Sequence, residues 1–301
     1  MKYLILLWLI NAAIFANDIP DAIDSDLTTL EIDKIQNKES KNAMNRWLSG
    51  TFGLQPYKVN YILPYGYSNQ LYKSYTPTDK YKSTEAELQV SLKLNVGNNL
   101  FGLNESYYLS YSHLALWQIY SESSPFRETN YNPDGFVIFP IYDENSGFNL
   151  RSIKFAVAHK SNGQGSNRDV TYAKPEDNLG NRSRSINYIY TSIRLQQGTL
   201  LTDLTLMSRL SESEKTDDNP DIMDYQGNAE LKLSYFAGKQ MYTLMGRGSF
   251  STGLGAIEGT YSYPLLNDAF LYFKVFSGYG ESLIDYNNEI TKCSVGFSFS
   301  R

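Results

Sequence analysis

Two residues that could carry out nucleophilic catalysis lie two positions apart in the segment 153–163. His159, one of only 2 histidines in the chain, is followed by Lys160 and then by Ser161. The segment reads as a β-strand, in which alternate side chains share a face and Cα atoms two residues apart are separated by roughly 6.5 Å. A base and a nucleophile are therefore expected side by side. Their companions on that face are apolar, namely Ile153, Phe155 and Val157.

A serine–histidine pair needs a third group that orients the imidazole ring, usually by accepting a hydrogen bond from its second nitrogen. The next predicted strand supplies Asn187, and every second residue after it is Ile, Thr, Ile and Leu. Asn187 therefore also belongs to a largely apolar face. Spacing alone leaves open the alternative that His159 and Ser161 are ordinary polar residues near the end of a strand.

The elements that would position these residues are long strands in which apolar and polar side chains alternate. Between residues 86 and 96, Ala, Leu and Val occupy every second position, and polar residues lie between them. Alternation over about ten residues is typical of bacterial outer-membrane barrels, whereas strands of soluble sandwiches usually have about five or six residues. We therefore predict an all-β fold, a transmembrane antiparallel β-barrel of about twelve strands. The strands are expected near 58–66, 84–97, 105–120, 135–142, 150–161, 186–196, 199–211, 227–236, 241–250, 254–264, 270–279 and 290–299.

The composition supports a membrane barrel and argues against other classes. The chain has 25 Tyr and 15 Phe in 301 residues, and aromatic residues cluster near the ends of predicted strands, as they do in interfacial girdles. A net charge of −5 provides no basic footprint, so we expect no nucleic-acid partner. The single cysteine, Cys293, cannot form an intramolecular disulfide, and alternation along 290–299 predicts that it faces lipid.

The chain divides into three parts by composition. Residues 1–16 combine one lysine, an apolar run and a small residue before a polar stretch, which is typical of a secretory signal peptide. Residues 17–55 form an acidic and polar N-terminal extension, with a short helix expected around 34–47. Residues 56–301 are assigned to the outer-membrane barrel, with the catalytic site on its outer face.

Five runs of residues, in order along the chain, resemble the motifs of a known family. Two of them hold the candidate catalytic residues: 159–163 (His-Lys-Ser-Asn-Gly) and 183–187 (Ser-Arg-Ser-Ile-Asn). The others are 123–131 (Ser-Ser-Pro-Phe-Arg-Glu-Thr-Asn-Tyr), 217–221 (Asp-Asp-Asn-Pro-Asp) and 277–287 (Ser-Gly-Tyr-Gly-Glu-Ser-Leu-Ile-Asp-Tyr-Asn). On these motifs the chain resembles the bacterial outer-membrane phospholipase A family, a family of twelve-stranded barrels.

This resemblance implies a calcium-dependent serine hydrolase that acts on membrane glycerophospholipids and lysophospholipids as a phospholipase A1 and A2. By the same resemblance, Ser161 is the nucleophile, His159 is the base and Asn187 orients the imidazole. A neutral asparagine gives a developing imidazolium less charge stabilisation than an aspartate would. The site is therefore expected to depend more strongly on stabilisation of the oxyanion.

The resemblance further implies Ca²⁺ as the cofactor, close to the oxyanion. The ligands it implies are the main-chain carbonyl of Gln164, the hydroxyl of Ser183 and the hydroxyl of Ser123 from a second subunit, with Asp218 in a weaker site. The connection 164–182 is longer than the family typically has. Three acids within it could add or replace calcium ligands: Asp169, Glu176 and Asp177.

A homodimer with shared calcium would make activity depend on dimerisation, which would protect the cell's own membrane. His113 lies within the apolar stripe of residues 107–119, where an unsatisfied polar group is costly. Two readings stay open for it: contact with water near the membrane interface, or a hydrogen bond across the dimer at a position where the family carries an amide. The expected location is the bacterial outer membrane, with the active site towards the extracellular side.

Two other classes of function compete with a lipid-hydrolysing enzyme. The first is a catalytically inactive porin or structural outer-membrane barrel, which would need its polar groups in the lumen. The second is a surface adhesin, which would be expected to have several large loops. The face that carries His159, Ser161 and Asn187 separates the enzyme from the porin, and alternation favours the outer face.

Overall fold

The computed structural model describes residues 36–42, 53–72, 80–141, 149–165, 182–213, 217–266 and 269–300. The expected signal peptide, 1–16, and most of the extension 17–55 lie outside these ranges. The chain divides into two compact units, Met1–Leu54 and Gln55–Arg301. In the first unit, a short helix covers residues 38–42.

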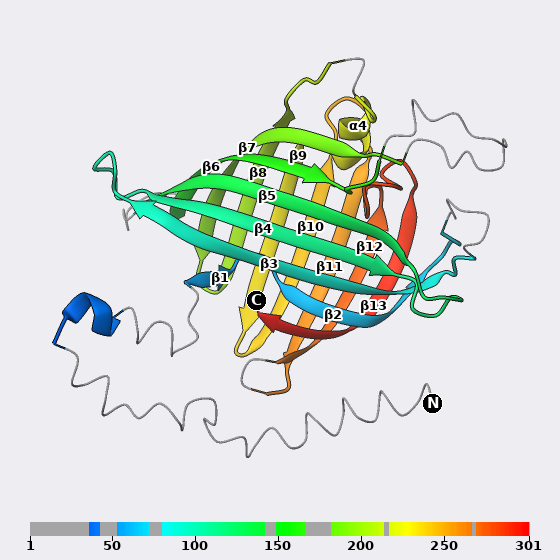
Figure 1. Ribbon diagram of the computed structural model, residues 1–301, viewed down its shortest axis with the longest axis horizontal. Coiled ribbons are helices and arrows are strands. Elements are labelled where there is room, and N and C mark those ends of the chain that lie inside the picture. The colour runs from blue at the N-terminus through cyan, green and yellow to red at the C-terminus, as the bar shows by residue number, and fades with distance from the viewer. Residues whose placement is uncertain are drawn as a thin grey trace. The chain divides into compact units, whose positions relative to one another are not determined.

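The second unit contains a closed antiparallel β-sheet. Within the described residues, each of the twelve strands β2 to β13 pairs with its neighbours in sequence, and β2 also pairs with β13, which closes the barrel (Figure 1). The strands are β2 (Asn60–Ser68), β3 (Thr84–Asn98), β4 (Ser106–Trp117), β5 (Phe126–Pro140), β6 (Leu150–Ser161), β7 (Ser185–Gln197), β8 (Leu200–Arg209), β9 (Ala229–Ala237), β10 (Gln240–Gly248), β11 (Gly255–Pro264), β12 (Phe270–Gly278) and β13 (Ile290–Ser300). A three-residue strand, β1 (Leu54–Pro56), precedes them. The prediction of a barrel of about twelve strands is confirmed.

The distribution of side chains is the reverse of that in a soluble protein. On β3, the apolar Val90 and Val96 are 53% and 52% exposed, whereas the acidic Glu85 and Glu87 are 0% and 1% exposed. The single cysteine, Cys293, is exposed on β13. Apolar side chains are likewise exposed on other strands, including Leu109, Phe155, Val157, Ile189, Leu206, Leu231, Ile257 and Val275. The period of two in the sequence therefore corresponds to an apolar outer face and a polar inner face.

One predicted boundary is wrong. Strand β5 begins at Phe126 rather than near residue 135. Its first half reads as a polar loop because the inward side chains are polar and because Pro133 interrupts the pattern. In the barrel, Asn130, Asn132 and Asp134 are buried, whereas Pro133 is exposed.

The two ends of the barrel differ in their connections. One end carries short turns such as 198–199 and 238–239, whereas the other carries the connections 118–125 and 279–289 and the helix α4 (Ile222–Gln226). No helix among the described residues is long and apolar enough to cross a membrane. Strand β6 ends, and β7 begins, at the end with the longer connections, and these two strands carry the candidate catalytic residues.

Candidate active site

Strands β6 and β7 place His159 directly opposite Asn187. The imidazole Nδ1 of His159 lies 2.8 Å from the side-chain Oδ1 of Asn187, which is a hydrogen bond. Both residues are half-buried. The orienting contact expected for a serine–histidine–asparagine arrangement is therefore present between neighbouring strands.

Alternation along the two strands decides which way these side chains point. Lys160 and Tyr188, the neighbours of His159 and Asn187 in sequence, line the cavity inside the barrel. Side chains of a strand alternate between its two faces. His159 and Asn187 consequently point away from the lumen, on the face where Val157 and Ile189 are 55% and 47% exposed.

Ser161 is the last residue of β6 and lies two positions beyond His159 on the same face. Its register partners are Tyr131 on β5 and Ser185 on β7. The hydrogen bond in this group joins His159 to Asn187, and catalytic contacts to a nucleophile commonly tighten only when substrate binds. The three residues predicted as a triad are thus brought to one outward-facing site.

Asn162 organises the chain directly after Ser161, a role that sequence reasoning did not assign. It is 2% exposed. Its Oδ1 accepts hydrogen bonds from the backbone N–H groups of Gln164 at 3.2 Å and Arg184 at 3.0 Å, and its Nδ2 donates to the carbonyl of Arg182 at 2.8 Å. We call this set of contacts the Asn162 clasp. It joins the segment 162–165 to the segment 182–184.

Gly163 completes the turn after Ser161. Its φ angle is +64°, in the left-handed region that favours glycine, and a Cβ atom built there would lie 2.9 Å from Cε2 of Tyr131. The backbone can pass this closely to the tyrosine ring only because residue 163 has no side chain.

The expected calcium ligands fall into two groups. The Asn162 clasp brings Gln164 and Ser183 to the same part of the chain, and Asn219 bonds both backbone groups of Ser185, which places Asp218 beside the start of β7. Ser123 is exposed in the connection between β4 and β5, where its φ is +58°. Among the described residues, no group of three His, Cys, Asp or Glu side chains is suited to a metal ion.

A site built from carbonyl and hydroxyl oxygens would contain no such group of side chains. These oxygens are ligands that Ca²⁺ accepts. The clasp fits this requirement because it aligns backbone around Gln164 and Ser183 without using the carbonyl of Gln164. The three acids considered as additional ligands, Asp169, Glu176 and Asp177, lie outside the described residues.

A buried charged cluster holds the end of the barrel that carries this site. Arg127 donates to Glu85 at 2.8 Å, to Glu281 at 3.1 Å and to Asp285 at 2.5 Å, and its side chain is 0% exposed. The backbone N–H groups of Leu283 and Ile284 donate to Asn130 and Glu128 on β5. These contacts dock the connection 279–289 onto the inner wall of the barrel.

A second cluster supports the beginning of β7. Ile186 packs against Ile222 of α4 and against Leu283 and Tyr286 of the docked connection. The hydroxyl of Tyr286 donates to Asp221 at 2.6 Å, and burial together with this hydrogen bond raises the pKa of the Tyr286 phenol. Because Ile186 precedes Asn187, the apolar cluster fixes the strand from which the Asn187 amide projects.

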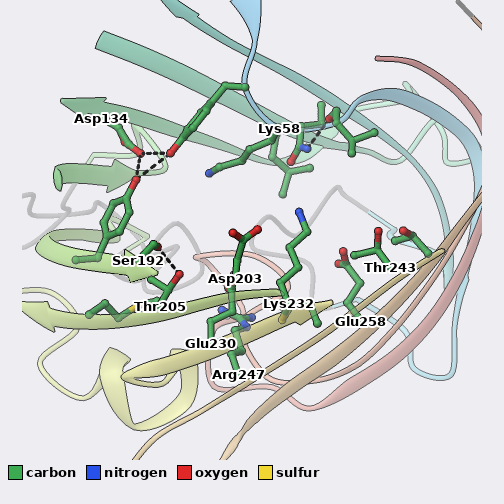
Figure 2. A pocket seen from close by; sticks show the side chains of 18 of the residues that line it. Lys58, Asp134, Ser192, Asp203, Thr205, Glu230, Lys232, Thr243, Arg247 and Glu258 are labelled. Carbon is green, nitrogen blue, oxygen red and sulfur yellow. Dashed lines mark hydrogen bonds between the residues drawn. The ribbon is translucent and has the colours of Figure 1, made fainter. Parts of the chain in front are cut away.

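The lumen has a different chemistry from the outer face. A cavity of about 480 Å³ lies inside the barrel, and Figure 2 shows charged side chains reaching into it from its walls. Tyr190 donates to Asp134 at 2.7 Å, Tyr57 and Tyr190 lie 2.9 Å apart at their hydroxyls, and Lys154 donates to Tyr57 at 3.2 Å. The labelled charged residues are Lys58, Asp134, Asp203, Glu230, Lys232, Arg247 and Glu258.

The outer face carries an apolar groove beside the candidate triad. Its volume is about 760 Å³. Gly135 on β5 leaves space in its floor, since a Cβ there would meet the nearest atom, Cδ2 of Leu109, at 3.8 Å. The apolar side chains that line the groove include Val96, Leu109, Val137, Phe155, Val157, Ile189 and Leu206.

A closed antiparallel barrel with an apolar exterior and a polar interior is a transmembrane barrel of the bacterial outer-membrane type. Polar groups that serve a pore belong in the lumen of such a barrel, whereas His159, Ser161 and Asn187 lie on the apolar exterior. The fold and the site together define an outer-membrane barrel with a hydrolase-like group of residues on its outer wall.

Comparisons with known proteins identify the family. The family model of phospholipase A1 matches residues 36–299. The chain is 36% identical over 251 residues to phospholipase A1 of Escherichia coli and 35% identical to that of Salmonella typhimurium, in each case across 81% of both chains. The chain belongs to the phospholipase A1 family, as the resemblance of its motifs led us to expect.

Solved structures agree with this assignment. Outer membrane phospholipase A from Escherichia coli has a TM-score of 0.72 and 33% identity, covering 83% of this chain and 93% of that chain. A dimer of the Salmonella typhi outer membrane phospholipase, crystallised with bound calcium, has the same TM-score and coverage with 34% identity.

Proposed function

We propose that the protein is a serine-dependent phospholipase A that hydrolyses acyl ester bonds of membrane glycerophospholipids and lysophospholipids, with A1 and A2 activity. The observation that carries this proposal is the hydrogen-bonded pair of His159 and Asn187, 2.8 Å apart, next to Ser161 on the apolar outer face. A substrate that reaches this face within a bilayer is a lipid. The relatives named phospholipase A1 support the same substrate class.

The reaction follows the chemistry of a serine–histidine pair. The Ser161 hydroxyl attacks the ester carbonyl while His159 takes its proton, and His159 then returns this proton to the departing alcohol of the lysophospholipid. Water next attacks the acyl–serine ester with His159 again as the base, which releases the fatty acid. Asn187 holds the imidazole in the orientation that both steps require.

The apolar groove suits one acyl chain of the substrate. Phe155, Val157 and Ile189 line it on the same strands that carry His159 and Asn187. An acyl chain lying there would hold its ester near the end of β6. This arrangement limits the motion of the ester relative to Ser161, which is how positioning accelerates a reaction.

Calcium and a second subunit complete the proposed enzyme. Gln164 and Ser183 would hold Ca²⁺ together with Ser123 of a second subunit, and Asp218 would belong to a weaker site. Bound Ca²⁺ would supply positive charge close to the oxyanion. The related phospholipase of Salmonella typhi, solved as a dimer with bound calcium, supports a homodimer that shares calcium between subunits and is active in that state.

The proposed location of the chemistry is the outer leaflet side of the bacterial outer membrane. Ser161 and Asn187 lie at the end of the barrel with the longer connections, and in outer-membrane barrels the extracellular loops are the long ones. The active site would therefore lie towards the extracellular side. A secretory signal peptide over 1–16 is consistent with export to this membrane.

Release of fatty acid from phospholipid in detergent tests the proposal, with calcium or with a chelator. We expect calcium-stimulated release by the native protein and a fall of at least about a thousandfold for Ser161→Ala. Ser185→Ala is the matched control, because Ser185 is the register partner of Ser161 on β7 and the substitution also removes one serine hydroxyl. Absence of calcium-stimulated release, or release that Ser161→Ala does not change, would contradict the enzyme and favour an inactive porin or structural barrel.

A further inference from the structure

A carboxylate lies behind the proposed triad. Glu212 follows strand β8, and its Oε1 accepts a hydrogen bond of 3.0 Å from Nδ2 of Asn187. The backbone N–H of Leu210 donates to the carbonyl of Asn187 at 2.8 Å, which fixes the chain beyond β8 alongside Asn187. Asn187 is therefore held between His159 on one side and Glu212 on the other.

The contact with Glu212 determines how the Asn187 amide is oriented. A carboxylate can only accept hydrogen bonds, so the NH₂ group of Asn187 must face Glu212 and its carbonyl oxygen must face His159. That oxygen also can only accept, so Nδ1 of His159 must carry the proton. Nε2 is then the nitrogen with a free lone pair, which is the nitrogen a base uses towards serine.

We propose that Glu212 is a positioning residue that acts through Asn187, forming an ordered relay from Glu212 through Asn187 and His159 to Ser161. This inference rests on the proposed function of the triad. Glu212 fixes the tautomer of His159, and its negative charge polarises the amide that contacts the ring. The relay supplies the charge that a neutral asparagine lacks when the imidazole becomes positive.

The surroundings of Glu212 leave its charge available for this role. Within the described part of the chain, Glu212 forms no ion pair with a lysine or arginine, unlike the buried acids Glu85, Glu87 and Asp285. The carboxylate lies one side chain away from the imidazole. It can therefore influence the ring without forming a direct ion pair on the apolar outer face.

Steady-state kinetics of Glu212→Gln, in detergent with saturating calcium, provide the first test. Glutamine keeps the size and an acceptor oxygen but removes the charge, so we expect kcat to fall about tenfold, or ~1.4 kcal/mol, with little change in KM. Glu289→Gln is the matched control, because Glu289 is exposed at the same end of the barrel and loses the same charge. An unchanged kcat for Glu212→Gln would overturn the relay, provided that Ser161→Ala is inactive.

A double substitution tests whether Glu212 acts through Asn187. In an Asn187→Ala background the mediating amide is absent, so adding Glu212→Gln should change kcat by less than about twofold. A tenfold fall in that background as well would overturn the relay. Folding of every variant is checked by its heat-dependent mobility in denaturing gels. Glu212→Asp keeps the negative charge that Glu212→Gln removes, so its kcat should lie between those of the native protein and Glu212→Gln.

The tautomer of His159 provides a readout that does not depend on catalysis. Because the chain has 2 histidines, His113→Gln leaves His159 as the only one. Nitrogen NMR shifts should place the proton on Nδ1, and Glu212→Ala should produce a mixture of tautomers. A proton on Nε2 in the presence of Glu212 would overturn the relay, whereas hydrolysis that survives Ser161→Ala would defeat the proposed function and leave this measurement valid.

Discussion

Replacing Asn162 by alanine should disturb the site without touching any proposed catalytic residue. The substitution removes one side-chain oxygen that accepts two backbone N–H groups and one side-chain nitrogen that donates to a backbone carbonyl. Because Asn162 is 2% exposed, these backbone groups lie where water has poor access. The change therefore acts on the connection between 162–165 and 182–184.

The magnitude follows from the hydrogen bonds that are lost. A typical hydrogen bond contributes about 1 kcal/mol net, so loss of all those made by the side chain should cost ~3 kcal/mol. Asn162→Asp is the matched variant, because a carboxylate still accepts from Gln164 and Arg184 and loses only the donation to the Arg182 carbonyl. Its cost should be at least about 1 kcal/mol, because a buried carboxylate oxygen then faces the Arg182 carbonyl without a proton to donate.

Calcium titration of fatty-acid release measures the consequence. If the lost free energy falls entirely on the arrangement of Gln164 and Ser183, the calcium concentration for half-maximal activity should rise up to about a hundredfold for Asn162→Ala. The aspartate variant should shift it by at least about fivefold. Unfolding in urea, followed by tryptophan fluorescence, records the part of the cost that appears as global stability. Native calcium dependence and native unfolding in both variants would refute the role of the clasp.

Two further predictions concern the end of the barrel and the dimer. Arg127→Leu should destabilise the barrel by about 3–5 kcal/mol in urea unfolding, because Glu85 and Asp285 lose a buried guanidinium partner. Arg127→Lys should recover only part of this stability, since one ammonium cannot bond several carboxylates in a fork. A cost below about 1 kcal/mol for Arg127→Leu would contradict the docking of 279–289. His113→Leu should raise the dissociation constant of a calcium-dependent dimer about three- to tenfold in sedimentation experiments without changing barrel stability, since hydrogen bonds in membranes average about 0.6 kcal/mol. Unchanged dimerisation would favour His113 as a residue in contact with water.

The strands were largely predictable because lipid outside and polar groups inside impose a period of two. Strand β3 follows this rule from Thr84 to Asn98, and its predicted range of 84–97 agrees closely. The first half of β5 was missed for a physical reason. Its inward side chains bond within the barrel, its outward ones include Thr129 and Pro133, and so neither face is apolar enough to reveal a strand.

The site was predictable only in part. Alternation could assign His159 and Asn187 to apolar faces, but their pairing depends on the register between β6 and β7, which a long connection does not restrict. Glu212 had no signal at all. It lies in a polar run whose position relative to Asn187 is set by where β8 ends and by the backbone hydrogen bond of Leu210.

A reaction on the outer wall of a barrel lacks the enclosing pocket that positions groups in soluble enzymes, so its precision must come from the strands themselves. The pairs Tyr131 with Ser161 and Asp134 with Ala158 place Pro133 opposite His159. Proline has no N–H to offer the neighbouring strand. The lumen-side amide of Asn132 instead donates to the carbonyl of His159 at 2.8 Å. The polar interior thus replaces the missing ladder contact at the residue where the proposed chemistry requires a fixed backbone, which links the charged lumen to the orientation of a lipid-facing histidine.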